Sequence, residues 1–147
     1  MGETMAMTDT STQVPPPQVW PTLRARDAAA LIDFLVDAFG FVVTERVGTG
    51  DLVAHAELAW PNGGGIMLGS APAEPDPGDA WPLRPGTFGG YAVTDDPDAI
   101  FARAVDRGAT VVREPHDTDY GARECVLRDP EGNYWSFGTY RGAPRPA

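Results

Sequence analysis

The chain has 147 residues, the size of one compact domain, and 42% of them are hydrophobic, enough to build a folded core. Its 21 acidic residues outnumber its 11 basic ones, and the formal net charge of -10 repels nucleic-acid phosphates and anionic lipid head groups. These numbers argue against nucleic-acid and membrane partners and favour a cationic ligand. The 17 glycines and 15 prolines indicate many turns and argue against a helical bundle.

The single cysteine and the terminal segments favour a cytoplasmic protein. Cys125 has no second cysteine with which to form a disulfide or a zinc knuckle. Residues 1–18 lack the basic start and apolar run of a signal peptide, and their polar, proline-rich composition predicts a disordered tail. Residues 141–147 are expected to form a second tail.

The first expected module covers residues 19–69 and opens with a strand over Val19–Arg26. Asp27 is placed to cap the following helix, whose apolar side chains recur at helical spacing until Gly40 ends it. Three strands are then expected over residues 41–47, 52–60 and 65–69, and a Pro-Asn-Gly turn joins the last two. The order of elements is therefore βαβββ.

The second expected module, residues 87–140, has the same order. A strand over 87–94 leads to a helix that Asp96 caps, with Pro97 at its first position and Gly108 beyond its end. Strands follow over residues 110–113, 122–128 and 133–139. Residues 70–86, rich in Pro, Gly and Asp, form a linker long enough to act as a flap over a cleft. Its acidic residues, Asp79 among them, are expected to face solvent.

The two modules align at a constant offset of 69 residues. This offset places Asp27 on Asp96, and it places the turn segment Leu58–Gly63 on Leu127–Gly132 without a gap. A collinear set of matches of this kind indicates an internal duplication. The sequence thus predicts an α+β fold made of duplicated βαβββ modules.

Three segments carry a resemblance to a known family. They are Pro21–Asp27, Phe39–Phe41 after the helix, and Arg128–Asn133 followed by Trp135–Phe137. Together with the duplication they resemble the vicinal oxygen chelate superfamily, which includes glyoxalase I, extradiol dioxygenases, and fosfomycin and bleomycin resistance proteins. The resemblance implies that paired modules curl into an antiparallel-rich half-barrel around a cleft, commonly completed by the partner chain of a homodimer. It bears on the fold more than on the function, because function lies in the site residues.

Metal-dependent members of that superfamily hold a divalent ion with residues of the first and last strand of each module, usually His, Glu or Gln. The positions that match here are Trp20, Met67, Gly89 and Ser136. None of the four supplies the nitrogen or carboxylate donor that such an ion requires. We therefore expect neither a metal site nor another cofactor.

The leading interpretation is a metal-independent protein that binds a small aromatic or cationic molecule, an antibiotic being one example, as in the bleomycin resistance proteins it resembles. An acidic cleft with aromatic walls would attract such a molecule and stack on it. The cleft is expected to have Trp20, Met67 and Ser136 on its wall and Tyr120 and Trp81 at its mouth. Since one module of ~50 residues buries too little surface to be stable alone, the modules must pair, and we expect a C2 homodimer.

Two other classes of function stay open at this point. One is a glyoxalase-like lyase, isomerase or epimerase that uses a differently held divalent metal, or His55, Glu57 or Glu124 as a general base. His55 and Glu57 lie two residues apart on a predicted strand and therefore share one face. The other class is a structural or regulatory interaction module whose cleft is filled by its own side chains. Cys125 is expected to be a small buried hydrophobe, and Asp129 and Asn133 are expected to be turn residues.

Overall fold

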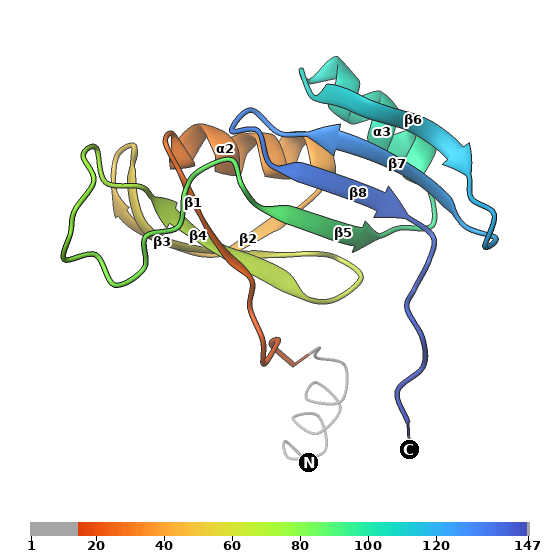
Figure 1. Ribbon diagram of the computed structural model, residues 1–147, viewed down its shortest axis with the longest axis horizontal. Helices are drawn as coiled ribbons and strands as arrows, with labels where there is room; N and C mark the ends of the chain where they lie inside the picture. Colours follow the sequence, from red (N-terminus) through yellow and green to blue (C-terminus); the bar gives the residue numbers. More distant parts are fainter. Residues whose placement is uncertain (1–14, 147) are drawn as a thin grey trace, which may run out of the picture.

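The computed structural model describes residues 15–146 and contains two four-stranded sheets, which lie side by side in Figure 1. The first sheet has the order β1-β4-β3-β2 and consists of β1 (Thr22–Ala25), β2 (Val42–Thr49), β3 (Leu52–Ala59) and β4 (Gly65–Ser70). The second has the order β5-β8-β7-β6 and consists of β5 (Gly89–Val93), β6 (Thr110–Asp117), β7 (Arg123–Arg128) and β8 (Tyr134–Gly138). Of the tail expected over residues 1–18, residues 1–14 lie outside the described part.

The helix of each module begins at the aspartate that the sequence indicates. Asp27 accepts a hydrogen bond from the backbone N–H of Ala30 at 3.1 Å, at the start of α2 (Ala28–Phe34). A short π-helical segment, η1 (Leu35–Phe39), continues α2 and ends at Gly40, whose φ of 96° lies in the left-handed region that favours glycine. Asp96 caps α3 (Pro97–Asp106) in the same way. Both predicted caps are confirmed.

The strand register confirms the duplication. Thr22 of β1 pairs with Met67 of β4, and the residues 69 positions later, Tyr91 of β5 and Ser136 of β8, pair in the same way. In each sheet the first and last strands are parallel, whereas all other neighbouring strands are antiparallel. The structure therefore has the expected α+β fold of two βαβββ modules.

A cluster of aromatic rings joins the two modules on the side that carries the helices. Phe39 at the end of η1 packs on Trp135 and Phe137 of β8, with ring centroids 5.8 and 4.7 Å apart. The Phe41 ring centroid lies 4.9 Å from that of Trp60 in the first module and 5.4 Å from that of Trp135 in the second. All five rings are at least nine-tenths buried. Each fully buried aromatic ring contributes on the order of 2 kcal/mol by leaving water, so this seam makes one folded unit of the two modules.

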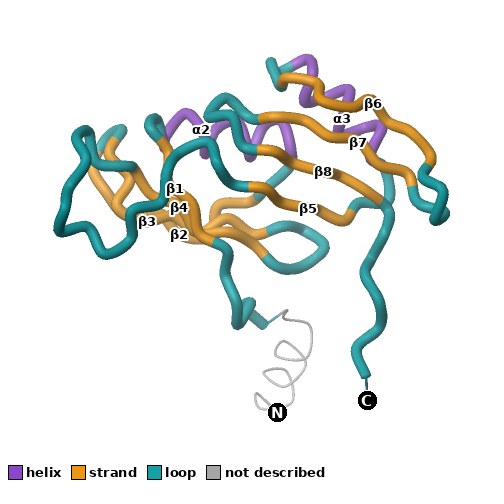
Figure 2. The backbone as a smooth tube through the Cα atoms, in the orientation of Figure 1, coloured by secondary structure: helices purple, strands orange, loops and turns teal. Residues whose placement is uncertain are grey.

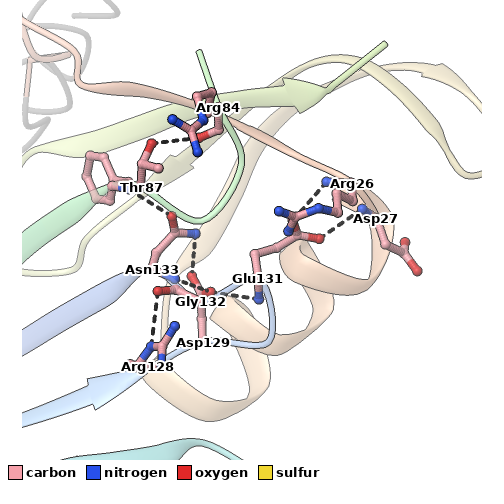
Figure 3. A network of polar contacts seen from close by, with 10 residues as sticks. Arg26, Asp27, Arg84, Thr87, Arg128, Asp129, Glu131, Gly132 and Asn133 are labelled. Atoms are coloured by element: carbon pink, nitrogen blue, oxygen red, sulfur yellow. Dashed lines mark hydrogen bonds and ion pairs between the residues drawn. The ribbon is translucent and has the colours of Figure 1, made fainter. Parts of the chain in front are cut away.

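The turn between β7 and β8 forms a buried polar network, which Figure 3 shows from close by. The Asp129 carboxylate accepts four hydrogen bonds, from the backbone N–H groups of Glu131 and Asn133, the Asn133 amide and the Trp135 indole. Asn133 in turn accepts a bond from the backbone N–H of Phe88 at 3.0 Å. Asp129 and Asn133 do occupy a turn, as expected, but they are 4% and 0% exposed, which turn chemistry alone does not predict.

Glu131 of the same turn reaches across to the first module. Its two carboxylate oxygens accept the backbone N–H groups of Arg26 and Asp27 at 2.8 and 2.9 Å, where α2 begins (Figure 3). The position 69 residues earlier holds Asn62, so the contact has no counterpart carboxylate in the first module. The two modules are therefore equivalent in their strands and different at this junction.

Two strands differ from the sequence prediction by more than two residues at one end. β1 is shorter than Val19–Arg26, and β6 extends four residues beyond Arg113, so His116, expected in a loop, lies in a strand. The pairing of β6 with β7 is irregular between Arg113 and His116, which accommodates Pro115 inside an outer strand. Because proline has no backbone N–H for strand pairing, Pro115 makes the sequence predict a strand that ends at Arg113. Over residues 15–146, no helix is long and apolar enough to cross a membrane.

Candidate functional site

Each sheet has one face packed against the helices and a second face without a helix, which we call its open face. Along β1 and β4 the buried residues are Leu23, Ala25, Ile66 and Leu68, so the alternate residues Thr22, Arg24 and Met67 lie on the first open face. In the second sheet Cys125, Leu127, Trp135 and Phe137 are buried, and the alternate residues Tyr91, Glu124, Tyr134 and Ser136 lie on the second open face.

The first open face contains a hollow of about 500 Å³, within the size range of small-molecule sites. It is lined by Met67 of β4, by His55 of β3 and by Trp81 of the linker. This linker is the long loop that joins β4 to β5 in Figure 2. The hollow therefore brings three of the predicted residues together under a segment that the sequence indicates as a flap.

An ion pair fastens the linker to the open face. The Arg24 guanidinium donates to both carboxylate oxygens of Asp79, at 2.8 and 3.1 Å, and the two side chains are only 21% and 15% exposed. The backbone N–H of Trp81 and the Arg24 guanidinium both lower the pKa of Asp79 below its ordinary value. The expectation that Asp79 faces solvent is wrong, because a partner 55 positions earlier in the sequence holds it.

Trp81 lies at the edge of the hollow and leaves part of its ring accessible. Its indole N–H donates to the Thr22 hydroxyl at 3.1 Å, which holds the ring against β1. The residue is 56% exposed, an unusual exposure for a tryptophan. An accessible indole of this kind can stack on a planar or cationic guest.

His55 and Glu57 are hydrogen-bonded to each other. The His55 Nε2 atom lies 2.8 Å from a Glu57 carboxylate oxygen, and the side chains are 41% and 29% exposed. A carboxylate beside one ring nitrogen orients the imidazole and leaves the other nitrogen for a proton transfer. The pair that the spacing indicates is thus formed, and His55 lines the hollow.

Trp20 lies beside the strands rather than among the residues that line this hollow. Its indole N–H donates to the backbone carbonyl of Pro17 at 3.2 Å. Its ring lies so close to Gly65 that a Cβ atom on that residue would be 2.9 Å from the ring. Trp20 is therefore packed against β4, while its role in a cleft stays a prediction.

The second open face carries a cluster of tyrosines around one carboxylate. The Tyr91 and Tyr120 hydroxyls both donate to the same oxygen of Glu124, at 2.9 and 2.6 Å. Tyr140 packs edge-on against Tyr120, with ring centroids 6.0 Å apart, and its backbone N–H donates to the Tyr91 hydroxyl. Ser136 is the neighbour of Tyr91 in the strand register.

The phenols of this cluster resist ionisation. Desolvation, followed by the hydrogen bond to Glu124, raises the pKa of Tyr91 to about 12. The hydrogen bond to Glu124 is the main cause that raises the pKa of Tyr120 above its ordinary value. At neutral pH both groups therefore remain neutral hydrogen-bond donors.

A second hollow, of about 570 Å³, lies between the β3–β4 turn and β5. Its walls include Trp60, Phe88 and Trp135, and the glycine-rich turn 63–65 forms one side. The Trp60 indole donates to the backbone carbonyl of Val93 at 2.8 Å, which ties the turn to the outer strand of the second sheet. This hollow is more aromatic than the first.

Apart from Trp20, the predicted residues thus fall into two groups. Met67, Trp81 and His55 line the first hollow, and Glu57 is bonded to His55, whereas Ser136, Tyr120 and Glu124 lie on or beside the second open face. Neither described hollow is lined by residues of both groups.

Sequence reasoning missed the roles of Arg24, Asp79, Tyr91 and Tyr140. Arg24 and Asp79 are far apart in the chain and carry no local signal for pairing. A signal for the tyrosines did exist, because all four tyrosines of the chain lie after residue 86, in the second half.

The four positions at which the resemblance implies a metal do not fit a divalent ion. Gly89 has no side chain, Met67 offers only a soft thioether, and the Trp20 indole is a donor that already bonds Pro17. The Ser136 hydroxyl donates to the backbone carbonyl of Cys125 at 3.4 Å. Elsewhere in residues 15–146, no three His, Cys, Asp or Glu side chains are close enough to share an ion.

Comparisons with known proteins agree with the fold. A model of the Glyoxalase/Bleomycin resistance protein/Dioxygenase superfamily matches residues 18–137. An uncharacterized protein of Mycobacterium bovis is 39% identical over 128 residues, which cover 83% of this chain and 82% of that protein. An uncharacterized protein of Mycobacterium tuberculosis strain H37Rv has the same identity over 128 residues, which cover 83% of this chain and 74% of that protein.

Two crystal structures are similar to the chain at above 25% sequence identity. TioX from Micromonospora sp. ML1 superposes with a TM-score of 0.68 at 26% identity, covering 89% of this chain and 100% of that one. A glyoxalase/bleomycin resistance protein from Streptomyces sp. CB03234 superposes with a TM-score of 0.59 at 27% identity, covering 79% of this chain and 94% of that one.

Proposed function

The chain belongs to the Glyoxalase/Bleomycin resistance protein/Dioxygenase superfamily, and on that premise we propose that it binds a small aromatic or cationic molecule without a metal ion. The observation that carries the proposal is the donor set: Trp20, Met67, Gly89 and Ser136, the positions at which the resemblance implies a metal, offer no imidazole, carboxylate or amide oxygen to hold one. The hollows of about 500 and 570 Å³ add support, since they offer room for a guest beside accessible aromatic rings. They argue against an interaction module whose cleft its own side chains fill.

The charge of the chain favours a cationic guest. The net charge is -10, and Asp76 lines the first hollow while Glu124 lies on the second open face. A negative field of this kind speeds the encounter with a cation and weakens as salt is added. The structural neighbour from Streptomyces is named a glyoxalase/bleomycin resistance protein, and an antibiotic is therefore one candidate guest for this chain.

A C2 homodimer would unite the two groups of predicted residues. β1 and β5 are outer strands, each hydrogen-bonded to only one neighbour within the described chain, and so each leaves one edge unpaired. The helix-side faces are already buried inside the chain, so the open faces are the surfaces that a partner can cover. In the proposed dimer the first open face of one protomer lies opposite the second open face of its partner, and Met67 and Trp81 face Ser136 and Tyr120 across the cleft.

Native mass spectrometry and calorimetry test these proposals together. We expect a dimer at micromolar concentration, and a bound molecule that is either retained through purification or selected from a panel of cations with flat aromatic rings, which includes metal-free bleomycin. Chelator should leave the affinity unchanged, and replacing Met67 and Trp81 by alanine should weaken it by about tenfold or more. The control is Val105→Ala, which truncates an exposed apolar side chain on α3, away from both open faces. Affinity that disappears with the chelator would contradict metal independence.

The bond between His55 and Glu57 favours a second candidate, a glyoxalase-like lyase, isomerase or epimerase with His55 as general base. The imidazole faces the first hollow, and the Glu57 carboxylate would stabilise the charge that it gains on accepting a proton. Exchange of substrate C–H protons for deuterium, measured on a panel of hemithioacetals and 2-substituted thioesters, tests this candidate. Turnover that His55→Gln abolishes and Glu57→Gln slows would support the enzyme, and no exchange with any compound would favour the binding protein.

A further inference from the structure

All four tyrosines of the chain lie exposed in the second module. Tyr91 and Tyr134 lie on the second open face, and Tyr120 and Tyr140 contact Tyr91 or Glu124 from the adjoining loops. Each is between 43% and 60% exposed, whereas Trp60 after β3 and Trp135 of β8 are at least 91% buried. Two of these phenols, Tyr91 and Tyr120, bond the same carboxylate, and exposed rings beside a carboxylate are the surface chemistry that favours a cation.

A glycine makes this arrangement possible. Tyr91 lies on β5 and Glu124 on β7, so the Tyr91 side chain must cross β8 to reach the carboxylate. It crosses at Gly138, where a Cβ atom would lie 2.1 Å from the Tyr91 hydroxyl and 2.6 Å from the Glu124 Cγ atom. Any larger residue at position 138 would separate the two groups.

The negative charge of Glu124 is not neutralised by its neighbours. Arg123 is held by Asp98 and Asp117, Arg141 by Asp95, and Arg128 lies over the Tyr134 ring at 5.0 Å. His116 faces Glu124 across the β6–β7 pair, but its Nδ1 atom bonds the Glu114 backbone carbonyl. Among the described residues, Glu124 forms no ion pair, and only one of its two oxygens receives the phenols.

We propose that Tyr91, Tyr120, Tyr140 and Glu124 form a subsite for an alkylated ammonium group. The phenols that donate to Glu124 hold its carboxylate in place, and hydrogen bonding to an anion makes their rings richer in electrons. An ammonium with alkyl substituents contacts the ring faces and the free carboxylate oxygen while its methyl groups replace water on the aromatic surface. The subsite rests on the proposed small-molecule function, for which it identifies the cationic end of the ligand.

The probe for this subsite is choline, and its neutral isostere 3,3-dimethyl-1-butanol has the same shape without the charge. NMR titration of the tyrosine ring protons should show that choline binds about tenfold or more tightly than the alcohol. Tyr120→Leu should weaken choline binding by a similar factor, and Tyr120→Phe should weaken it less because it keeps the ring. Glu124→Gln should remove most of the preference for choline over the alcohol. Each variant is checked for its fold by circular dichroism.

Tyr134→Leu is the control, since Tyr134 lies on the same face but contacts Arg128 instead of Glu124. It should leave choline binding within about twofold of wild type. Equal affinities for choline and the alcohol would overturn the proposal, and so would a folded Glu124→Gln variant that keeps the preference. The Met67 and Trp81 variants separate this result from the wider proposal. Suppose that these variants bind choline as wild type does and that no larger guest binds the protein. The subsite would then be supported, and the proposed function would be contradicted.

Discussion

Asp129 holds the turn between β7 and β8, from which Glu131 reaches the first module. Its carboxylate is 4% exposed and accepts four hydrogen bonds, among them one from the Trp135 indole in the aromatic seam. We expect Asp129→Ala to lower the free energy of unfolding by ~3–5 kcal/mol, because it leaves several buried N–H donors without an acceptor. Urea unfolding measures this loss, with Glu74→Ala in the exposed linker as the control. A loss below ~1 kcal/mol would show that the network adds little to stability.

Cys125 provides a prediction about reactivity and pH. Its side chain is fully buried, as expected from the sequence, and burial raises the pKa of the thiol to about 11 from its ordinary value of 9.0. Because the thiolate is the nucleophile, iodoacetamide should leave the folded protein unmodified at neutral pH and label it after unfolding. Between pH 9 and 11 the folded state keeps a proton that the unfolded state loses, so stability should fall as pH rises.

The matched variant Cys125→Ala should flatten the fall in stability between pH 9 and 11. Tyr91, with a pKa raised to about 12, adds a similar fall at higher pH that this variant keeps. The two contributions are separated by unfolding the Tyr91→Phe variant over the same range. Rapid labelling of the folded wild type at pH 7 would contradict the burial of the thiol.

At the scale of elements, the linker is held by its contact with β1. The pKa of Asp79 is lowered by the Trp81 backbone N–H and by Arg24, so its stabilising charge is present above the ordinary pKa of 3.8 and is lost as pH falls through the lowered value. Asp79→Asn should release the linker at neutral pH, seen as faster proteolytic cleavage within residues 71–86 and lower fluorescence anisotropy of Trp81. Glu74→Gln is the control, and equal cleavage of both variants would show that other contacts hold the linker.

The elements that could be predicted from sequence are those with local causes. Asp27 and Asp96 each cap the helix that begins directly after them. The internal repeat predicts the same order of strands for both modules, and both have it. The Arg24–Asp79 pair joins positions 55 residues apart, and nothing near either residue indicates the other. The same holds for Tyr91, whose reach to Glu124 depends on which strands become neighbours and on Gly138 between them.

At the scale of the whole molecule, the aromatic seam should make the two modules unfold together. Phe39 belongs to the first module and is 1% exposed, yet two of its ring contacts, Trp135 and Phe137, belong to the second. We expect Phe39→Ala to cost ~3–5 kcal/mol and to weaken β3 and β7 alike. Hydrogen exchange followed by mass spectrometry measures the protection of both strands. Loss of protection in β3 with full protection in β7 would show that the modules are independent.

The reach of Glu131 to the start of α2 has a consequence for synthesis of the chain. The first module leaves the ribosome before Glu131, Trp135 and Phe137 have been translated. The backbone N–H groups of Arg26 and Asp27 then lack the Glu131 acceptor. Phe39 likewise lacks its ring contacts with the second module. The nascent first half therefore exposes an apolar surface for as long as the ribosome takes to add the second. If the order of the halves in the gene were reversed, the second module would be made first and would expose its side of the seam instead. The two modules are thus similar in structure, but only the first must remain without its partner during synthesis.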